Sequence, residues 1–293
     1  TGRLLALKWN KPVIRLCTTL VFTEEYNPYL RFIHLHPEID SEHPALRAER
    51  DAMLKALEAH GLGALTPEEF KADATMIRKN IVFLPREIQV GADHFGPEYA
   101  FVGPCLGDRG FQGEWRPAKP RAAGAPLVVI AFGTFGYASQ QQFFADCVTE
   151  FADTPWHVVL VVGHRVTEED LAPLPGNIEV HRWIPQLAVL GQADAFVSHA
   201  GMGSVTEALY TTTPVVLLPQ LTEQDLVAEQ VTRLGLGRVI PRETLSAAAV
   251  REAVADVLGD ADIGDRLAAM ARAMRDAGGA VRAADEIEHC AAS

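Results

Sequence analysis

The feature that most constrains this chain is a series of short segments, apolar throughout, that begins after residue 125. Each segment is bounded by Gly, Pro or Asn, and helix-compatible stretches lie between most of them. Strands that are apolar on both faces must be covered on both faces, which is typical of a parallel sheet between two layers of helices. The predicted strands are 127–132, 156–162, 178–181, 195–198 and 214–218. We therefore expect a doubly wound α/β domain here.

Helical signals complete this domain. A polar, helix-compatible stretch leads to Phe151. Residues 246–258 are amphipathic, with Ser246 as the N-cap and Gly259 just past the end, and a last helix is predicted at 280–290.

The first part of the chain carries weaker signals of the same kind. Strands are predicted at 12–16, 81–84 and 100–102, and a helix at 45–60. The Thr-Pro-Glu-Glu sequence at 66–69 is a capping box that predicts another helix. Between residues 107 and 126 the chain is rich in Gly, Pro, Ala and charge, without apolar periodicity, which is typical of a linker.

The length of 293 residues suits one large domain or two ordinary ones. We predict a partial N-terminal domain at 1–112, a linker at 113–125, a second domain at 126–279 and a closing helix at 280–293. The chain opens on Thr1, without Met and in the middle of a helical pattern. We expect it to be the remainder of a longer protein.

Charge and apolar runs exclude two classes of partner. A formal net charge of −12 argues against nucleic acid, because phosphate backbones require clustered Lys and Arg. No apolar run approaches the ~20 residues of a membrane-spanning helix. The four scattered cysteines lack metal or redox spacing and the start lacks a signal peptide, so we expect thiols and a cytoplasmic location.

The residues that point to chemistry lie between 183 and 224. The stretch Ser-His-Ala-Gly-Met-Gly-Ser at 198–204 reads as a strand that ends in a Gly-rich turn and opens a helix. Gly201 and Gly203 are expected to take positive φ and to let a ligand approach, while the helix start offers N–H groups to an anion. His199 can donate to a phosphate oxygen. Together these residues predict a diphosphate site.

Two other interpretations of this stretch stay open. Ser204 and Glu207 fit a capping box, in which they only satisfy the start of the helix. Alternatively, Gly201 and Gly203 resemble the start of a dinucleotide fingerprint, with Glu223 twenty residues further on as the ribose acid. Thr206 occupies the place of the third glycine, and the turn is not the first strand-to-helix turn of its domain.

Flanking residues extend the predicted site. An indole at Trp183 can stack on a planar base, although a Trp before Ile-Pro is more often packing. Gln186 can reach a ribose hydroxyl, and Glu223 with Gln224 can bind the hydroxyls of a sugar. These pieces fall at the ends of successive strands, where open α/β sheets bind ligands.

The combined pattern resembles the donor signature of UDP-dependent glycosyltransferases, and more closely the bacterial macrolide glycosyltransferases. It consists of Trp-x-Pro-Gln at 183–186, His-Ala-Gly-x-Gly-Ser at 199–204 with Glu207, and Pro-Gln-x-x-Glu-Gln at 219–224. The likeness extends to 101–105, 131–134 and 278–279. It implies the GT-B fold, two facing Rossmann-like domains with the final helix crossing back, and here an incomplete N-terminal one.

The resemblance also implies roles for single residues. Trp183 would stack on uracil and the Ile184 backbone would pair with the base edge. The remaining implied roles are ribose binding by Gln186 and Glu207, diphosphate binding by Thr134, His199, Gly201, Gly203 and Ser204, and sugar binding by Glu223 and Gln224. Macrolide-type members usually carry Asp at position 223, so Glu223 bears on the identity of the sugar.

The general base of the family is a His oriented by an Asp, and both are expected at positions before residue 1. Without that pair, donor binding should survive and transfer should be severely reduced. His34 and His36, with His43, could suggest a base or a metal site, but His-x-His in a polar loop is more often surface. The catalytic residues are therefore left unassigned, and no metal site is predicted.

The function predicted for the full-length protein is inverting transfer of a hexose, with glucose preferred, from UDP to a hydroxyl of an apolar, macrolide-like acceptor. No metal or cofactor is implied beyond the UDP-sugar, and a homodimer stays open. Residues 20–29 either line the acceptor pocket or pack in the core. The alternatives are a non-catalytic sugar-nucleotide-binding subunit, a transferase that uses a dTDP-deoxysugar, and an NAD-dependent oxidoreductase.

Overall fold

The protein is described by a computed structural model that covers residues 6, 9, 11–23, 27, 43–61, 77–107, 110–132 and 140–292. Thr134, His34, His36 and the capping box at 66–69 lie outside the described residues.

The larger of two sheets has six parallel strands in the order β6-β5-β4-β7-β8-β9. Its strands are β4 (Leu127–Ala131), β5 (His157–Val161), β6 (Ile178–His181), β7 (Ala195–Ser198), β8 (Val215–Leu217) and β9 (Gly237–Val239). The strands predicted from the sequence are confirmed, while β9 was missed because Gly-Arg-Val carries no apolar run. Taken along the chain, this is the doubly wound order 3-2-1-4-5-6, which reverses direction between β4 and β7.

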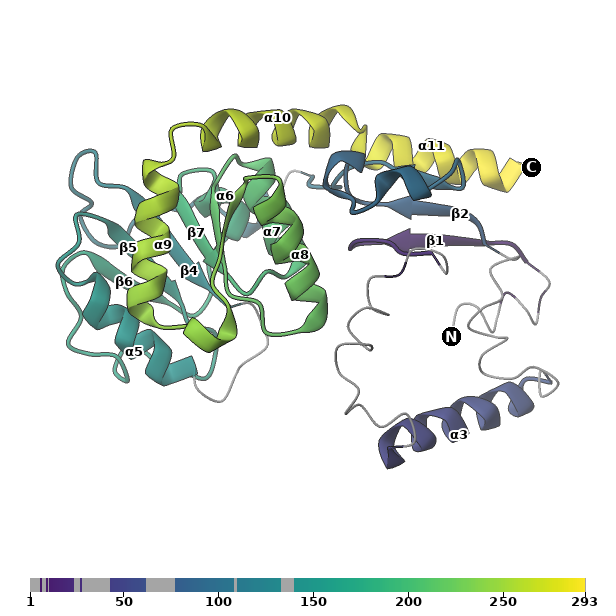
Figure 1. The fold of residues 1–293 in the computed structure, drawn as a ribbon, viewed down its shortest axis with the longest axis horizontal. Coiled ribbons are helices and arrows are strands. Elements are labelled where there is room, and N and C mark those ends of the chain that lie inside the picture. Colours follow the sequence, from purple (N-terminus) through teal and green to yellow (C-terminus); the bar gives the residue numbers. More distant parts are fainter. Residues whose placement is uncertain are drawn as a thin grey trace.

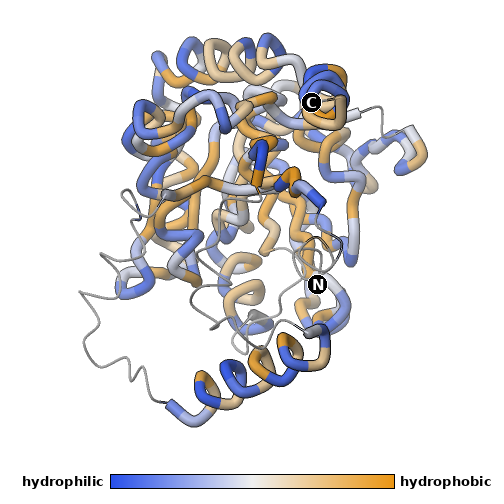
Figure 2. Tube along the Cα trace, turned by 90° about the vertical axis from the view of Figure 1, so that its right-hand side faces the viewer, coloured by the Kyte–Doolittle hydropathy of each residue, from blue (hydrophilic) through white to orange (hydrophobic). Residues whose placement is uncertain are grey.

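Helices cover this sheet (Figure 1). They are α5 (Gln140–Phe151), α6 (Gln186–Leu190), α7 (Met202–Tyr210), α8 (Thr222–Arg233), α9 (Ala247–Gly259) and α10 (Ile263–Asp276), with a 3-10 turn at Arg242–Thr244. Ser246 caps α9 by accepting from the Ala249 amide at 3.1 Å, as predicted. Gly259 is the last residue of α9 rather than the residue after it. The strands are hydrophobic along their length and the helices two-sided, so the core lies between them (Figure 2).

The smaller sheet has three parallel strands, β1 (Val13–Cys17), β2 (Ile77–Val82) and β3 (Tyr99–Phe101), in that order. Helix α3 (Pro44–Ala59) and short 3-10 turns at Arg86–Ile88, Ala92–His94 and Gly110–Gln112 complete this part. Strand β2 begins four residues before the predicted one. The first residues of β2 are mostly polar, and they pair with β1 through specific partners. For example, Oδ1 of Asn80 accepts a hydrogen bond from Nε of Arg15 at 2.6 Å.

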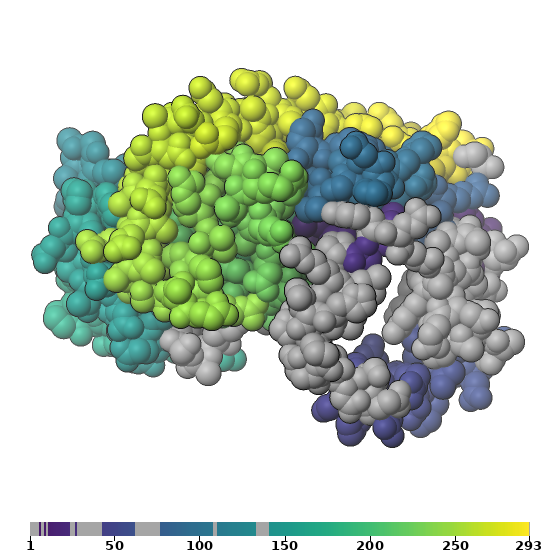
Figure 3. Space-filling view, viewed as in Figure 1, coloured from purple at the N-terminus to yellow at the C-terminus, as the bar shows by residue number. Residues whose placement is uncertain are grey.

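The final helix, α11 (Gly279–Ala292), lies on the small sheet, while α10 before it packs on α7 and on the 3-10 turn Arg86–Ile88 (Figure 1). The Gly279 amide donates to the Val102 carbonyl at 2.6 Å, and Lys79 of β2 pairs with Glu286 at 2.8 Å. In Figure 3 these two helices form a continuous ridge over both parts of the molecule. They therefore join the two sheets.

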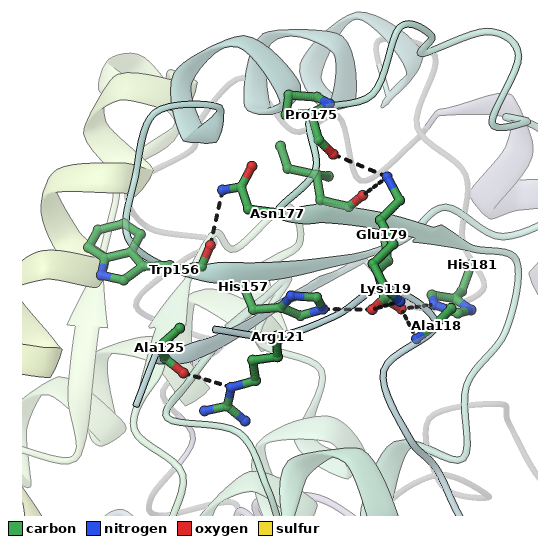
Figure 4. Close-up of polar contacts among 11 residues, drawn as sticks. Ala118, Lys119, Arg121, Ala125, Trp156, His157, Pro175, Asn177, Glu179 and His181 are labelled. Atoms are coloured by element: carbon green, nitrogen blue, oxygen red, sulfur yellow. Dashed lines mark hydrogen bonds and ion pairs between the residues drawn. The ribbon is translucent and has the colours of Figure 1, made fainter. Parts of the chain in front are cut away.

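The segment that leads from the small sheet to β4 is anchored on β6 (Figure 4). Glu179, only 2% exposed, accepts hydrogen bonds from the amides of Ala118 and Lys119, each at 3.0 Å. It also contacts the ring nitrogens of His157 at 2.6 Å and His181 at 2.8 Å. Burial by itself would raise the pKa of Glu179, but the hydrogen bonds from His181, the two amides and His157 outweigh it and lower the pKa to about 2. We call these five residues the Glu179 cluster.

One apolar core includes residues next to both sheets, and a smaller separate cluster lies between the small sheet and α11. Leu20 and Val21, which follow β1, are buried in the same cluster as the strands of the large sheet. This supports the core interpretation for the described start of residues 20–29. In the described part of the chain, no helix is long and apolar enough to cross a membrane.

Candidate functional site

The candidate site lies at the carboxyl ends of the strands of the large sheet. The strand order reverses between β4 and β7, and a crevice at such a reversal is where open α/β sheets bind ligands. The turn that follows β7 at this point contains His199, and α7 begins three residues later at Met202.

The turn differs from the sequence expectation in where its unusual backbone lies. The left-handed residue is Ala200, with φ 64°, whereas Gly201 has φ −63° and is extended. The need for glycine at 201 has another cause, because a Cβ there would lie 2.5 Å from Nε2 of His199. Gly201 therefore makes room for the imidazole and does not supply the positive φ that was predicted.

Gly203 has no such structural reason. It lies in the first turn of α7, and a Cβ added to it would meet nothing within 4 Å. Alanine at a helical position is favoured over glycine by about 0.5–1 kcal/mol, so this glycine is not explained by the protein's own packing. It leaves the start of α7, with its unpaired N–H groups, open to a ligand.

His199 lies in an environment that favours the neutral form of its imidazole. Burial lowers its pKa, because the positive imidazolium is desolvated. Its Nδ1 is buried and has no hydrogen-bond partner among the described residues, and the same holds for Oγ of Ser198. An anion placed here would favour the charged imidazole. Ser198 was not singled out from the sequence, where it read as the end of a strand.

Gln186, Ser204 and Glu207 form one group between α6 and α7. The Gln186 amide Nε2 donates to Glu207 at 2.8 Å and to Oγ of Ser204 at 3.3 Å. The capping-box interpretation is wrong, because α7 begins at Met202 and Ser204 is already its third residue. Instead, a carboxylate, an amide and a hydroxyl are held side by side, a set of groups that can bind two neighbouring hydroxyls.

Trp183 and Ile184 have opposite environments although they are adjacent. Trp183 is 59% exposed, whereas Ile184 is 4% exposed and belongs to the core. The interpretation of Trp183 as packing is therefore not supported. Ile184 holds the backbone in place, and Trp183, three residues before Gln186, offers a ring face at the surface.

Glu223 and Gln224 lie in the first turn of α8, after β8. Oε1 of Glu223 accepts from Oγ1 of Thr19 at 2.6 Å, a contact with the other part of the chain that sequence spacing could not reveal. Oε1 of Gln224 accepts from the amides of Gln220 at 2.7 Å and Leu221 at 3.2 Å. Gln224 therefore caps α8 through its side-chain oxygen, which leaves its amide nitrogen outside this contact.

The described residues bear on two remaining points, the dinucleotide interpretation and the role of His43. In a dinucleotide fold the ribose acid lies at the end of the strand after the glycine turn, whereas Glu223 lies six residues beyond the end of β8, within helix α8. His43 is the N-cap of α3, where its Nδ1 accepts from the Ala45 amide at 3.2 Å. In the described ranges, no group of three or more His, Cys, Asp or Glu is placed to hold a metal ion.

Comparison with known proteins gives consistent matches. Residues 147–287 match the family described as Erythromycin biosynthesis protein CIII-like, C-terminal domain. The chain is 35% identical over 289 residues to the NDP-glycosyltransferase YjiC of Bacillus subtilis (strain 168). The alignment covers 98% of this chain and 69% of the relative. It is also 35% identical over 292 residues to the oleandomycin glycosyltransferase of Streptomyces antibioticus, covering 98% of this chain and 65% of that protein.

Solved structures agree with the sequence matches. The structure of CalG4, the calicheamicin glycosyltransferase, superimposes with a TM-score of 0.80 at 35% identity, covering 98% of this chain and 71% of the other. The GT-B expectation of parallel α/β parts joined by the final helices is thereby confirmed.

Proposed function

Because this chain belongs to the bacterial glycosyltransferase family that includes the macrolide glycosyltransferases, we propose that it binds a UDP-hexose, with glucose preferred, for inverting transfer to a hydroxyl of an apolar, macrolide-like acceptor. One observation carries the choice of donor. Exposed Trp183 and the joined group of Gln186, Ser204 and Glu207 follow β6 and β7, and the uncovered start of α7 follows β7, so that all three lie beyond the carboxyl ends of neighbouring parts of the sheet.

The proposed donor binds along this edge from base to sugar. The uracil ring stacks on Trp183 and its edge pairs with the Ile184 backbone, and the ribose hydroxyls bind Gln186 and Glu207. The diphosphate lies over the start of α7, against His199, Gly203 and Ser204, with Thr134 as a further contact that lies outside the described residues. The sugar hydroxyls bind Glu223 and Gln224.

The chemistry that these residues supply is stabilisation of the leaving group. Negative charge grows on the diphosphate as the bond to the sugar breaks, and in the proposed binding mode the helix N–H groups and His199 lie next to it. Protonation of His199 by the incoming anion would strengthen this effect, and we propose that no metal ion is needed. The acceptor hydroxyl must also lose a proton, and we assign that role to no described residue.

The experiment that tests the donor assignment is calorimetric titration with UDP, with dTDP and NAD as comparisons. We expect UDP to bind most tightly, and Trp183→Ala to weaken it by about tenfold to a hundredfold, since base stacking contributes about 1–3 kcal/mol. Trp9→Ala is the matched control, because Trp9 is 60% exposed and Trp183 is 59% exposed.

His199→Ala should also weaken UDP, with the exposed His164→Ala as its control. UDP binding that is absent, or that both tryptophan variants lower equally, would contradict the donor site. Tighter binding of dTDP would instead favour a deoxysugar donor. Binding unaffected by EDTA is expected if no metal takes part.

A further inference from the structure

The contact between Thr19 and Glu223 links residues 204 positions apart, across the two parts of the chain. Thr19 follows β1 of the small sheet, and Glu223 lies in the first turn of α8, on the large one. The hydroxyl of Thr19 donates to one oxygen of the carboxylate at 2.6 Å.

Thr19 is held in place by the residues that follow it. Leu20 and Val21 are buried, and the side-chain amide of Gln89 pairs with both backbone groups of Val21. The Val21 amide donates to Gln89 Oε1 at 3.0 Å, and Gln89 Nε2 donates to the Val21 carbonyl at 2.8 Å. Gln89 is itself buried, so this pairing is shielded from water and fixes the backbone next to Thr19.

Helix α8 also makes a hydrogen bond to the residue next to Gln89. Buried Gln230 donates from Nε2 to the carbonyl of Ile88, the neighbour of Gln89, at 3.0 Å. Gln230 and Glu223 are seven residues apart, two helical turns, and so lie on one face of α8. The Thr19 contact is therefore part of an ordered interface. The Gln89 contacts position Thr19, and the Gln230 contact positions helix α8, which carries Glu223.

This arrangement restricts how Glu223 can meet a sugar. Its Oε1 is directed to Thr19, which leaves Oε2 to accept from the ligand. Gln224 next to it has its oxygen committed to two backbone amides, so it can offer only donors. The two neighbouring side chains thus present one acceptor and one donor group in a fixed arrangement.

We propose that Thr19 is a positioning residue for the donor sugar, which acts by holding the Glu223 carboxylate across the interface of the two parts. This inference rests on the proposed donor site. It makes recognition of the sugar, but not of UDP, depend on a hydroxyl from the small-sheet part. Binding of the hexose is thereby coupled to the contact between the two parts.

The contact with Thr19 also depends on the length of the Glu223 side chain. Aspartate at this position would be one methylene shorter, which removes roughly 1.5 Å of reach, more than a hydrogen bond of this length can absorb. The glutamate is therefore what allows contact with Thr19, and the carboxylate is oriented by the opposite part of the protein.

The test compares UDP with UDP-glucose as ligands of the same chain in calorimetric titration. Thr19→Val keeps the shape of the side chain and removes the donor. It should weaken UDP-glucose by about fivefold to tenfold, from a net hydrogen-bond contribution of about 1 kcal/mol, and leave UDP within about twofold. Thr19→Ser should restore the affinity for UDP-glucose. Thr18→Val is the matched control, because Thr18 is exposed and adjacent.

A double-mutant cycle gives a second readout. In the Glu223→Asp background, Thr19→Val should have no further effect on UDP-glucose, because the contact is already lost. Equal weakening of UDP and UDP-glucose would show a merely structural contact and overturn the proposal. No change in either ligand, or additive effects in the cycle, would overturn it as well. Failure of the parent chain to bind UDP at all would instead remove the proposed donor site on which it rests.

Discussion

Two polar clusters on the large sheet contain the same kinds of side chain but differ in whether the polar groups are paired. The Glu179 cluster buries a carboxylate whose two oxygens are met by two histidines and two amides. The second, around His199 and Glu207, leaves Nδ1 of His199 and Oγ of Ser198 without partners among the described residues, and leaves the surface over Gly203 open.

The difference teaches how to tell a structural cluster from a ligand site. A buried network with every group paired stabilises the chain and has nothing left to offer a ligand. A helix start with unpaired N–H groups can gain partners when an anion binds. An unpaired polar group by itself does not mark a ligand site, because buried Nε1 of Trp115 also lacks a partner among the described residues. What distinguishes the second cluster is that its unpaired groups precede the uncovered start of a helix.

The largest expected effect is on stability, at the Glu179 cluster. Glu179→Ala leaves two histidines and two amides without their acceptor and should lower the free energy of unfolding by about 3–5 kcal/mol. Denaturant unfolding measures this, with exposed Glu168→Ala as control. UDP affinity of the folded variant should stay near that of the parent; a selective loss of UDP binding would erase the distinction between the clusters.

Acid should weaken the same cluster reversibly. The pKa of Glu179 is about 2 in the folded chain against an ordinary value of 4.5, so its contribution is complete above about pH 4.5 and is lost as the pH falls toward 2. The difference amounts to at most about 3 kcal/mol. Unfolding measured from pH 6 to pH 3 should show a steeper loss for the parent than for Glu179→Ala. Parallel curves would mean that this carboxyl does not titrate as the contacts require.

The Glu207→Gln variant tests the second cluster, around His199 and Glu207. The carboxylate accepts from Gln186, and a neutral amide should bind ribose hydroxyls less well, because charge-assisted hydrogen bonds are about twice as strong. We expect UDP to bind about tenfold more weakly, a loss near 1.4 kcal/mol. Uracil, which lacks the ribose, is the control ligand, and its affinity should not change. Equal losses for both ligands would argue for a structural role of Glu207.

Gly203→Ala has the smallest expected effect on stability and sharpens the comparison most. A Cβ there meets open space, so alanine should raise stability by about 0.5–1 kcal/mol through helix propensity. The same methyl group should obstruct the diphosphate and weaken UDP. Gly264→Ala, also helical and with nothing near its Cβ, is the matched control and should leave UDP binding unchanged. A Gly203→Ala variant that binds UDP as the parent does would mean that no ligand lies over this turn.

Local patterns determined much of this protein. The apolar strands β4 to β8 and the cap at Ser246 could be identified from the sequence, because apolar runs and capping residues act over short range. The combined motif from Trp183 to Gln224 was identified by its resemblance to a known family. β9 and the polar start of β2 could not, since they are strands only because a neighbouring strand and α11 provide partners. The proposed division into parts at 113–125 and 280–293 stays a prediction.

Only the tertiary structure decided which contacts the motif residues make. The left-handed residue is Ala200 and not a glycine, Ser204 is not a helix cap, and Gln224 is one. The tertiary structure also brought Thr19 to Glu223, which no local pattern encodes. The physical reason is that a side chain acts through the partner within hydrogen-bond distance, and here those partners come from other strands and helices of the fold.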